Sequence, residues 1–207
     1  SLIRCELFTQ TLRSKLTQQR QPIPQGGLKR GNPCVHIRLR KGWFRERFTE
    51  HRGPLLMKVP RIKGGEDPAT IVGFEVEMMI LPMLKGVHVP RFIAKGDFAT
   101  RPYIVLEHIP GESLRPRLDE APLPIDEIAS IGARVATALH DLHRQHVIHL
   151  DVKPSNILFR PTGEAVLVDF GLSRHDHLPD LLDEEFTLPM GTGPYMSPEQ
   201  VQFVRND

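Results

Sequence analysis

Cysteine is scarce in this sequence, and long apolar runs are missing from it. Only two of the 207 residues are cysteines, Cys5 and Cys34, which is too few for a disulfide framework. We therefore expect a reducing compartment and a cytoplasmic protein. No apolar run approaches the roughly 20 residues that a transmembrane helix needs, and the N-terminal residues lack the apolar core of a signal peptide. The sequence thus predicts no membrane span in this chain.

The sequence also has no large excess of positive or negative charge. Lys and Arg number 27 and Asp and Glu number 25, which leaves a net charge of +2. So small an imbalance gives no reason to expect a nucleic acid or a membrane surface as the partner. The contents of hydrophobic residues, 40%, and of charged residues, 25%, are typical of a soluble globular protein, and the length allows one or two domains.

The most informative stretch is HLDVKPSNILFRPTGEAVLVDFG, residues 149–171. Asp151 and Asn156 are five residues apart, and Asp169 follows Asp151 by eighteen. Between Asn156 and Asp169, two short apolar runs flank a Pro-Thr-Gly turn signal, which predicts a β-hairpin. Because a hairpin brings its two ends together, we expect Asp151 and Asn156 to face Asp169 across one pocket.

These residue types suit phosphoryl transfer. A carboxylate such as Asp151 can accept or orient the proton of an attacking hydroxyl group. The oxygens of Asn156 and Asp169 can hold Mg²⁺ against a polyphosphate, because Mg²⁺ takes hard oxygen ligands. Lys153 stands two residues after Asp151 and can neutralise charge on the phosphoryl group that moves. Most of such catalysis would come from positioning and electrostatics.

Three motifs follow one another along the chain: HLDVKPSN, DFG and GTGPYMSPE, the last at residues 191–199. In this order and at these separations they resemble the eukaryotic-type (Hanks-type) protein kinase family, and Lys153 and Gly191-Thr192 are similar to its serine/threonine branch. The resemblance implies an α+β, bilobal fold, with an antiparallel-sheet N-lobe that carries one key helix and a mainly helical C-lobe. It also implies ATP with Mg²⁺, or Mn²⁺ in its place, and a protein substrate with a serine or threonine acceptor.

A nucleotide-binding lysine and its partner are predicted upstream of these motifs. Residues 55–59 are typical of a buried strand and contain a single lysine, Lys58. The resemblance implies that Lys58 holds the α- and β-phosphates of ATP. Glu77 follows Lys58 by 19 residues, a separation that resembles the family's Lys–Glu pair. We expect a salt bridge in which Glu77 orients Lys58, with Glu75 as the competing choice.

A helix is predicted around Glu77. Asp67-Pro68 is a favourable helix start. The apolar residues that follow share one helical face: Ile71, Phe74, Met78 and Leu81. Glu77 lies beside this face, whereas Glu75 points about 160° away from Glu77 on an ideal helix. We expect Pro82 to end or kink the helix.

The strand predicted at residues 103–107 leads into His108-Ile109-Pro110-Gly111. The resemblance implies that this segment is the hinge between the two lobes. Main-chain groups of Glu107 and Ile109 are then expected to bind the adenine ring. Leu106 is expected to guard the pocket behind the ring.

Apolar residues recur every three or four positions between Ile125 and Leu142, which predicts a well-buried helix that enters the catalytic loop. Histidines fall at every third residue near its end: His140, His143, His146 and His149. Helical histidine pairs can bind Zn²⁺, but no carboxylate or cysteine completes an ordered set, so a metal site is the less favoured interpretation. The resemblance implies instead that His149 packs the catalytic loop against the DFG turn. We expect His175 and His177 to be solvated.

Residues 172–190 resemble an activation segment. Thr192, just after it, resembles the substrate-side partner of the catalytic aspartate and lysine. Thr187 lies near the usual activating phosphorylation site. Leu150 stands where many regulated kinases have the arginine that pairs with this phosphate. We therefore expect an enzyme that does not depend strongly on phosphorylation of this segment.

Two features depart from the family pattern. No G-x-G-x-x-G motif precedes the nucleotide-binding lysine. Gly26, Gly27 and Gly31 would serve only if a long connection follows between two strands, and Gly42 is the alternative. Leu56 replaces the small residue that is usual over the adenine. Both departures weaken the expectation of ordinary ATP affinity, and neither touches the catalytic loop.

The chain also ends soon after Glu199, the acidic residue of the Ser-Pro-Glu motif, and the arginine that usually pairs with it is absent. We therefore expect a kinase domain that is truncated in the C-lobe and that exposes apolar surface there. The predicted divisions are an N-terminal extension at 1–33, an N-lobe at 34–107 and a partial C-lobe at 108–207.

Two other functions stay open. A pseudokinase is a binding module with the same fold. The weak glycine region favours it, and the intact set of chemical residues opposes it: Lys58, Glu77, Asp151, Asn156 and Asp169. A small-molecule kinase of the aminoglycoside or choline type shares the H-x-D-x-x-x-x-N pattern but generally lacks a Ser-Pro-Glu segment. Phosphorylation of serine or threonine in proteins is the favoured prediction.

Overall fold

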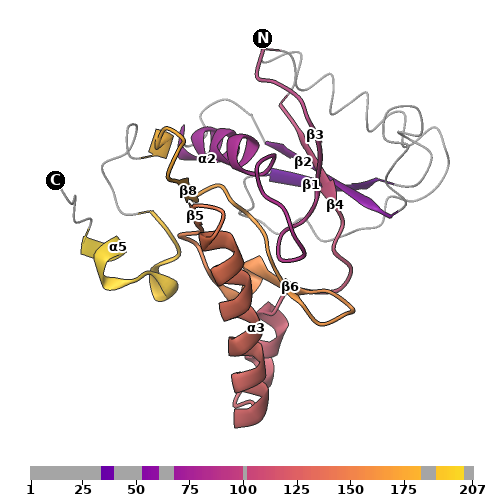
Figure 1. The fold of residues 1–207 in the computed structure, drawn as a ribbon, viewed down its shortest axis with the longest axis vertical. Helices are drawn as coiled ribbons and strands as arrows, with labels where there is room; N and C mark the ends of the chain where they lie inside the picture. Colours follow the sequence, from indigo (N-terminus) through magenta and orange to yellow (C-terminus); the bar gives the residue numbers. More distant parts are fainter. Residues whose placement is uncertain (1–33, 40–52, 61–67, 100–101, 183–189, 203–207) are drawn as a thin grey trace.

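The computed structural model describes residues 34–39, 53–60, 68–99, 102–182 and 190–202. These residues form an antiparallel sheet with one helix, α2, lying along it, and a second part built around the long helix α3 (Figure 1). The arrangement confirms the predicted α+β, bilobal class. Several residues of the sequence-based predictions lie outside the described ranges: the extension at 1–33, Gly26, Gly27, Gly31, Gly42 and Thr187.

The sheet has four strands: β1 (Cys34–Leu39), β2 (Leu55–Pro60), β3 (Phe92–Lys95) and β4 (Ile104–Glu107). Its order is β1-β2-β4-β3, and each neighbouring pair is antiparallel. Leu39 pairs with Leu55, so residues 40–54 connect β1 to β2.

Side chains alternate along β2, as the pleat of a strand requires. Leu55, Met57 and Val59 are buried in one apolar cluster together with Val105 of β4. Lys58 therefore points to the opposite face of the sheet, the face that α2 and the second part of the molecule cover.

Helix α2 runs from Pro68 to Ile80, two residues before Pro82. The predicted helix end is thus confirmed, because the residue before a proline is disfavoured in the helical region. The apolar face includes the buried Phe74 and Met78, whereas Glu75 on the other side is exposed.

The connection from α2 to β3 is bonded to the second part of the molecule. The Lys85 N–H donates to Gln145 Oε1 at 2.8 Å, and Gln145 Nε2 donates to the Lys85 carbonyl at 3.0 Å. The Leu167 N–H donates to the His88 carbonyl at 2.9 Å. The C-terminal end of α2 is therefore tied to the helical part and does not belong to the sheet alone.

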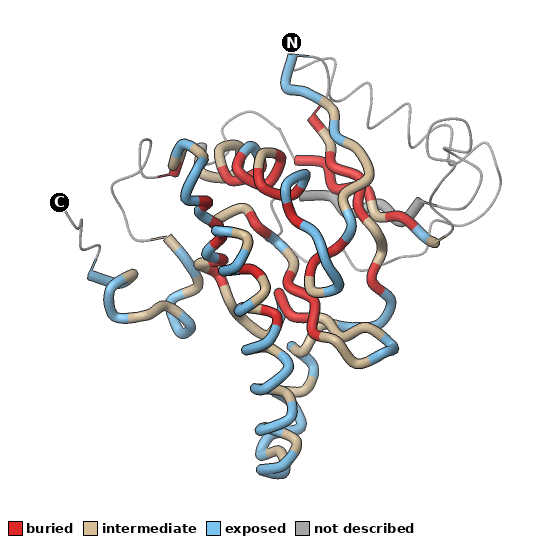
Figure 2. Tube along the Cα trace, in the orientation of Figure 1, coloured by how far each residue is buried: buried red, intermediate tan, exposed pale blue. Residues whose placement is uncertain are grey.

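Helix α3 runs from Ile125 to His143 and is buried only toward its C-terminal end. Leu142 is 1% exposed, whereas Ile125 is 80% and Ile128 is 48% exposed. Figure 2 shows the same gradient from buried to exposed along the helix. The prediction of a well-buried helix is wrong for its first half, because the elements that α3 chiefly contacts, β5 and β7, lie at its other end.

Short elements complete the helical part. The predicted hairpin is confirmed: β6 (Ile157–Phe159) pairs with β7 (Ala165–Leu167). Strand β5 (Val147–Ile148) pairs with β8 (Arg174–His175). The remaining elements are the 3₁₀-helices η1 (Arg115–Glu120), η2 (Pro154–Asn156) and η3 (Gly193–Tyr195) and the helix α5 (Pro198–Gln202).

One apolar core joins the two parts of the molecule. It includes Phe74 and Met78 of α2, Leu106 of β4, Leu142 of α3 and the fully buried Phe170. Among the described helices, none is both long enough and apolar enough to cross a membrane.

Candidate active site

Lys58 lies between two carboxylates at the junction of the sheet and the helical part. Its Nζ forms a salt bridge with Glu77 of α2, and it donates to Asp169 Oδ1 at 2.7 Å. The side chains of Lys58 and Glu77 are 8% and 2% exposed, and that of Asp169 is 51% exposed. The structure thus brings Lys58 to Glu77 and not to the exposed Glu75. We call Lys58, Glu77 and Asp169 the Lys58 cluster.

Burial and charge act in opposite directions on Glu77. Burial raises the pKa of the Glu77 carboxyl, and the Lys58 ammonium opposes that rise. Two buried charges are tolerated when each has its partner, whereas removal of one partner leaves an uncompensated charge. The Lys58 cluster therefore depends on α2 being held where Glu77 reaches Lys58.

A contact between two glycines holds α2 close to the DFG turn. A Cβ added to Gly73 of α2 would lie 2.9 Å from the Gly171 carbonyl oxygen, and a Cβ added to Gly171 would lie 3.2 Å from the Gly73 carbonyl oxygen. Neither position has room for a side chain unless the backbone moves. Sequence reasoning missed Gly73, although a glycine inside a helix is a signal that backbones approach closely.

Two residues of the site have left-handed backbone conformations, one directly before the predicted base and one in the DFG turn. Leu150 has a φ of 59° and Asp169 a φ of 70°, both in the left-handed region. Non-glycine residues adopt this conformation only where the surrounding structure enforces it. Leu150 is bonded to α5, because Gln200 Nε2 donates to the Leu150 carbonyl at 2.8 Å. Gln200 was not singled out from the sequence.

Three side chains donate hydrogen bonds to the Asp151 carboxylate, which is buried in the loop. Oδ1 accepts from Thr192 Oγ1 at 2.8 Å. Oδ2 accepts from Lys153 Nζ at 2.6 Å and from Asn156 Nδ2 at 3.1 Å. Lys153 Nζ also donates to Thr192 Oγ1 at 2.7 Å. We call Asp151, Lys153, Asn156 and Thr192 the Asp151 cluster.

His149 joins the two clusters. Its Nε2 is 3.2 Å from the Val168 carbonyl, and its Nδ1 accepts from the Asp151 N–H at 3.3 Å. These partners require the neutral tautomer with the proton on Nε2. Burial lowers the pKa of His149 and so favours this neutral form. The ring also packs on Phe170 with centroids 5.0 Å apart, as the predicted packing against the DFG turn requires.

The two predicted metal ligands, Asn156 and Asp169, lie in neighbouring segments. The Val168 N–H donates to the Asn156 carbonyl at 3.0 Å, which holds Asn156 next to the residue before Asp169. Asn156 Nδ2 faces Asp151, so the amide oxygen is directed to a different side. A carboxylate and an amide oxygen are ligands that fit Mg²⁺.

The zinc interpretation of the histidines is not supported in the described ranges. No group of three or more His, Cys, Asp or Glu side chains there could hold a metal ion. His140 and His143 are exposed on α3. The expectation that His175 is solvated is wrong: it lies in β8, is buried, and its Nδ1 accepts from the His177 N–H at 3.0 Å. Burial lowers the pKa of His175 as well.

The predicted hinge follows β4. Leu106 and Ile109 are both buried, and Leu106 pairs with Leu56 of β2. The Glu107 N–H donates to the Arg91 carbonyl at 2.9 Å. An adenine contact to Glu107 would therefore involve its carbonyl oxygen. The side chain of Glu107 forms a salt bridge with Arg160 at 2.6 Å, a contact that sequence reasoning did not anticipate.

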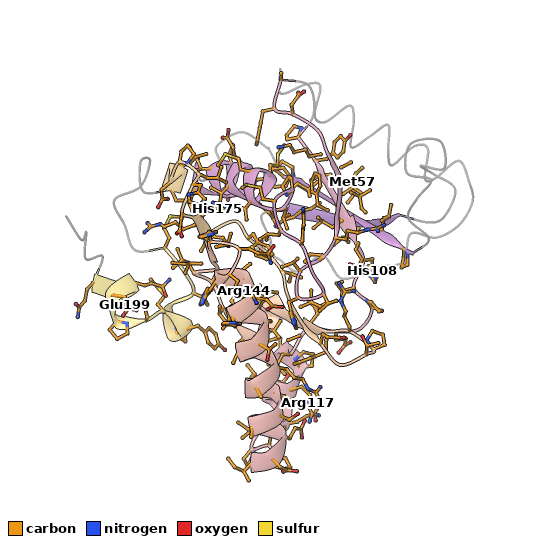
Figure 3. All side chains as sticks on the ribbon, in the orientation of Figure 1. Met57, His108, Arg117, Arg144, His175 and Glu199 are labelled. Carbon is orange, nitrogen blue, oxygen red and sulfur yellow. The ribbon has the colours of Figure 1, made fainter. Side chains whose placement is uncertain are left out.

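Glu199 lies apart from these clusters. It is exposed in the first turn of α5 and points away from the sheet that carries Met57 (Figure 3). Hydrogen bonds from its own N–H and from Ser197 lower the pKa of its carboxyl. Of the predicted residues after position 170, only Thr192 is brought to the Asp151 carboxylate in the part that the structure describes.

Comparison with known proteins points to one family. A family model described as protein kinase domain matches residues 61–206. The serine/threonine-protein kinase PknL of Mycobacterium tuberculosis is 31% identical over 150 residues, which cover 72% of this chain and 37% of PknL. PknB of Mycobacterium leprae is 31% identical over 152 residues, covering 70% of this chain and 24% of PknB. RUNKEL of Arabidopsis thaliana is 37% identical over 124 residues, which cover 59% of this chain and 9% of RUNKEL.

These matches have two consequences. This chain spans little more than a third of the length of PknL and less of the other two relatives. The matched residues nevertheless include α2, the catalytic loop, the DFG turn and the Ser-Pro-Glu segment, all of which have the arrangement described above. The chain belongs to the protein kinase family.

Proposed function

We propose that this chain is the catalytic part of an ATP-dependent serine/threonine protein kinase. The observation that supports this most directly is the joint presence of both clusters, with Lys58 bonded to Glu77 and Asp169 while Asp151 is bonded to Asn156. A module that only binds a partner has no chemical need for either arrangement. The names of the bacterial and plant relatives, all serine/threonine-protein kinases, support the choice of acceptor.

In the proposed reaction the acceptor hydroxyl attacks the γ-phosphorus of ATP. The new oxygen–phosphorus bond forms as the bond to the bridging oxygen between the β- and γ-phosphates breaks, which yields the phosphorylated protein and ADP. The hydroxyl proton passes to the Asp151 carboxylate. Thr192 donates to Asp151 Oδ1 and so fixes the orientation of the carboxylate. Lys153, 2.6 Å from Oδ2, supplies positive charge beside the reacting oxygen.

The nucleotide would lie between the hinge and the two clusters. Lys58 would hold the α- and β-phosphates, with its position fixed by Glu77. Asn156 and Asp169 would hold Mg²⁺, which when bound offsets the negative charge of the phosphates. Main-chain groups of Glu107 and Ile109 would bind the adenine ring, with Leu106 behind it.

The test is transfer of labelled phosphate from the γ-position of Mg-ATP to the protein itself and to a generic basic protein. Asp151→Asn is the matched control, because it retains the size of the side chain and removes its basicity. We expect transfer by the wild type, label on serine or threonine after hydrolysis, and a turnover about 10²- to 10⁴-fold lower in the variant.

Each other outcome selects a different function. If the wild type binds ATP and transfers nothing, the pseudokinase interpretation replaces the proposal. If label reaches an aminoglycoside or choline and no protein, the chain is a small-molecule kinase. If Asp151→Asn transfers phosphate as fast as the wild type, Asp151 is not the base.

A further inference from the structure

Arg160 is the first residue after β6 and makes four hydrogen bonds with its guanidinium. Two go to the Glu107 carboxylate: Nη1 to Oε1 at 2.6 Å and Nη2 to Oε2 at 2.9 Å. The other two go to main-chain carbonyls: Nε to Val87 at 2.8 Å and Nη2 to Val89 at 3.3 Å. The side chains of Arg160 and Glu107 are 17% and 23% exposed, so the pair is largely removed from water.

These bonds cross from one part of the molecule to the other. Arg160 belongs to the β6–β7 hairpin, which carries Asn156 at one end and leads to Asp169 at the other. Glu107 is the last residue of β4, and Figure 1 shows β6 at the point where the chain leaves the sheet after β4. Val87 and Val89 lie in the connection between α2 and β3. A single side chain therefore links three segments that are distant in sequence.

The Glu107 carboxylate accepts one further hydrogen bond. Its Oε2 accepts from the Arg91 N–H at 3.1 Å, while the Glu107 N–H donates to the Arg91 carbonyl. The Glu107 side chain thus takes one conformation, and with it the main chain at the start of the hinge is fixed. Two parallel bonds from a planar guanidinium define the direction of a carboxylate as well as its distance, which a lysine cannot do.

We propose that Arg160 is a positioning residue for the hinge and thereby sets the affinity of the site for the adenine ring. The inference rests on the proposed function, since it requires that the main chain at Glu107 and Ile109 binds adenine. With Arg160 in place, the hinge is ordered before the nucleotide arrives. Without it, nucleotide binding must first order the hinge, and that ordering weakens affinity. The Asp151 cluster, which Arg160 does not touch, keeps its geometry.

The test compares Arg160→Gln and Arg160→Lys with Arg117→Gln. Arg117 is a matched control because its guanidinium is also ion-paired, here with Glu120 and Glu127, but within the helical part. Figure 3 places Arg117 beside α3, away from His108 of the hinge. Binding is measured with a fluorescent ATP analogue, displaced either by adenosine or by inorganic triphosphate. The KM for ATP and kcat are measured in parallel.

We expect Arg160→Gln to weaken adenosine and ATP about tenfold, equivalent to about 1.4 kcal/mol, and to leave triphosphate affinity and kcat within twofold. Arg160→Lys should not restore the loss, because it cannot make the paired bonds. Arg117→Gln should behave as the wild type. Glu107→Gln should cause a similar loss, and the double variant with Arg160→Gln should be no worse than either alone, because the two residues act as one unit.

The inference is overturned if Arg160→Gln binds adenosine as the wild type does, or if it weakens adenosine and triphosphate equally, since a general loss of structure would do the latter. Failure of the proposed function is a separate result. If the wild type binds adenosine in an Arg160-dependent manner but transfers no phosphate, the proposed kinase activity is refuted and the role of Arg160 is not. If the wild type binds no adenine compound, both the proposed kinase activity and the proposed role of Arg160 are refuted.

Discussion

The Lys58 cluster and the Asp151 cluster are built in different ways. Lys58 reaches partners 19 and 111 residues away, on a helix and on the DFG turn. Three of the four members of the Asp151 cluster lie within five residues of one another, and only Thr192 comes from a distant segment. The Asp151 cluster is therefore fixed by one loop, whereas the Lys58 cluster exists only while α2 and the DFG turn are correctly placed. Substitutions should separate these two behaviours.

Lys58→Met should have the largest effect on stability. It removes the partner of a buried carboxylate, and breaking a buried pair in this way destabilises by about 3–5 kcal/mol. We also expect phosphate transfer to fall below detection, while Asp151→Asn should lose activity with a much smaller change in stability. Urea unfolding of the two variants provides the measurement.

The double variant Lys58→Met/Glu77→Leu is the control for this effect. Replacing both partners with apolar residues should recover much of the stability and none of the activity. A urea midpoint for Lys58→Met equal to that of the wild type would contradict the idea that Lys58 compensates a buried charge on Glu77.

Gly73→Ala should disturb the Lys58 cluster without touching its members. The added Cβ would meet the Gly171 carbonyl at 2.9 Å, so α2 must move away from the DFG turn. A displacement of about 1 Å in an active site can lower turnover about 10- to 100-fold. We expect such a loss in kcat/KM together with reduced stability.

Gly132→Ala in α3 is the matched control. It is also an interior helix glycine, and nothing lies within 4 Å of the added Cβ. This variant should be about 0.4–1 kcal/mol more stable than the wild type and equally active. If the two alanine variants had equal activity, the close contact of Gly73 with Gly171 would have no role in placing α2.

The pH dependence of stability should show the smallest effect, and it reports on the residue that joins the clusters. The pKa of His149 is lowered in the folded protein, so the unfolded chain takes up a proton at a higher pH than the folded chain does. Stability is then fully present above about pH 6.5, the unfolded pKa, and falls as the pH decreases below it, by at most about 1.4 kcal/mol per pH unit for one proton.

His149→Gln should make this dependence shallower, because glutamine does not titrate. Urea unfolding between pH 7.5 and 5.5 provides the comparison. His175, whose pKa burial also lowers, would contribute to the slope that remains, and Glu77, whose pKa burial raises, would oppose it. Parallel curves for the variant and the wild type would show that His149 is not kept neutral by the fold.

Much of the fold and the Asp151 cluster could be predicted because the determining signals are local. Turn residues between two apolar runs predicted the hairpin, and the five-residue spacing placed Asp151 and Asn156 together in the loop before it, where they are hydrogen-bonded. Pro82 predicted where α2 ends. In each case the conformation is set by neighbours in the sequence.

The features that were missed depend on distant contacts. Nothing in the neighbourhood of Arg160 shows that it meets Glu107, 53 residues earlier. His175 is buried because β8 pairs with β5, a contact between segments that carry no strand pattern of their own. The apolar spacing of α3 showed that one face is hydrophobic, but spacing does not tell how much of that face is covered.

The connection after α2 is anchored to the helical part, so the start of the helix can move farther than its end. Lys85 and His88 hold the connection that follows its C-terminal end, so we expect a rotation of α2 to pivot near Ile80. With a rise of 1.5 Å per residue, a tilt of about 10° would move Pro68 by about 3 Å, Gly73 by about 2 Å and Glu77 by less than about 1 Å. The ion pair of Glu77 lies close to the pivot, and the contact of Gly73 with Gly171 lies farther from it. A partner or ligand that pulls on the start of α2 would thus separate Gly73 from Gly171 well before it separates Glu77 from Lys58.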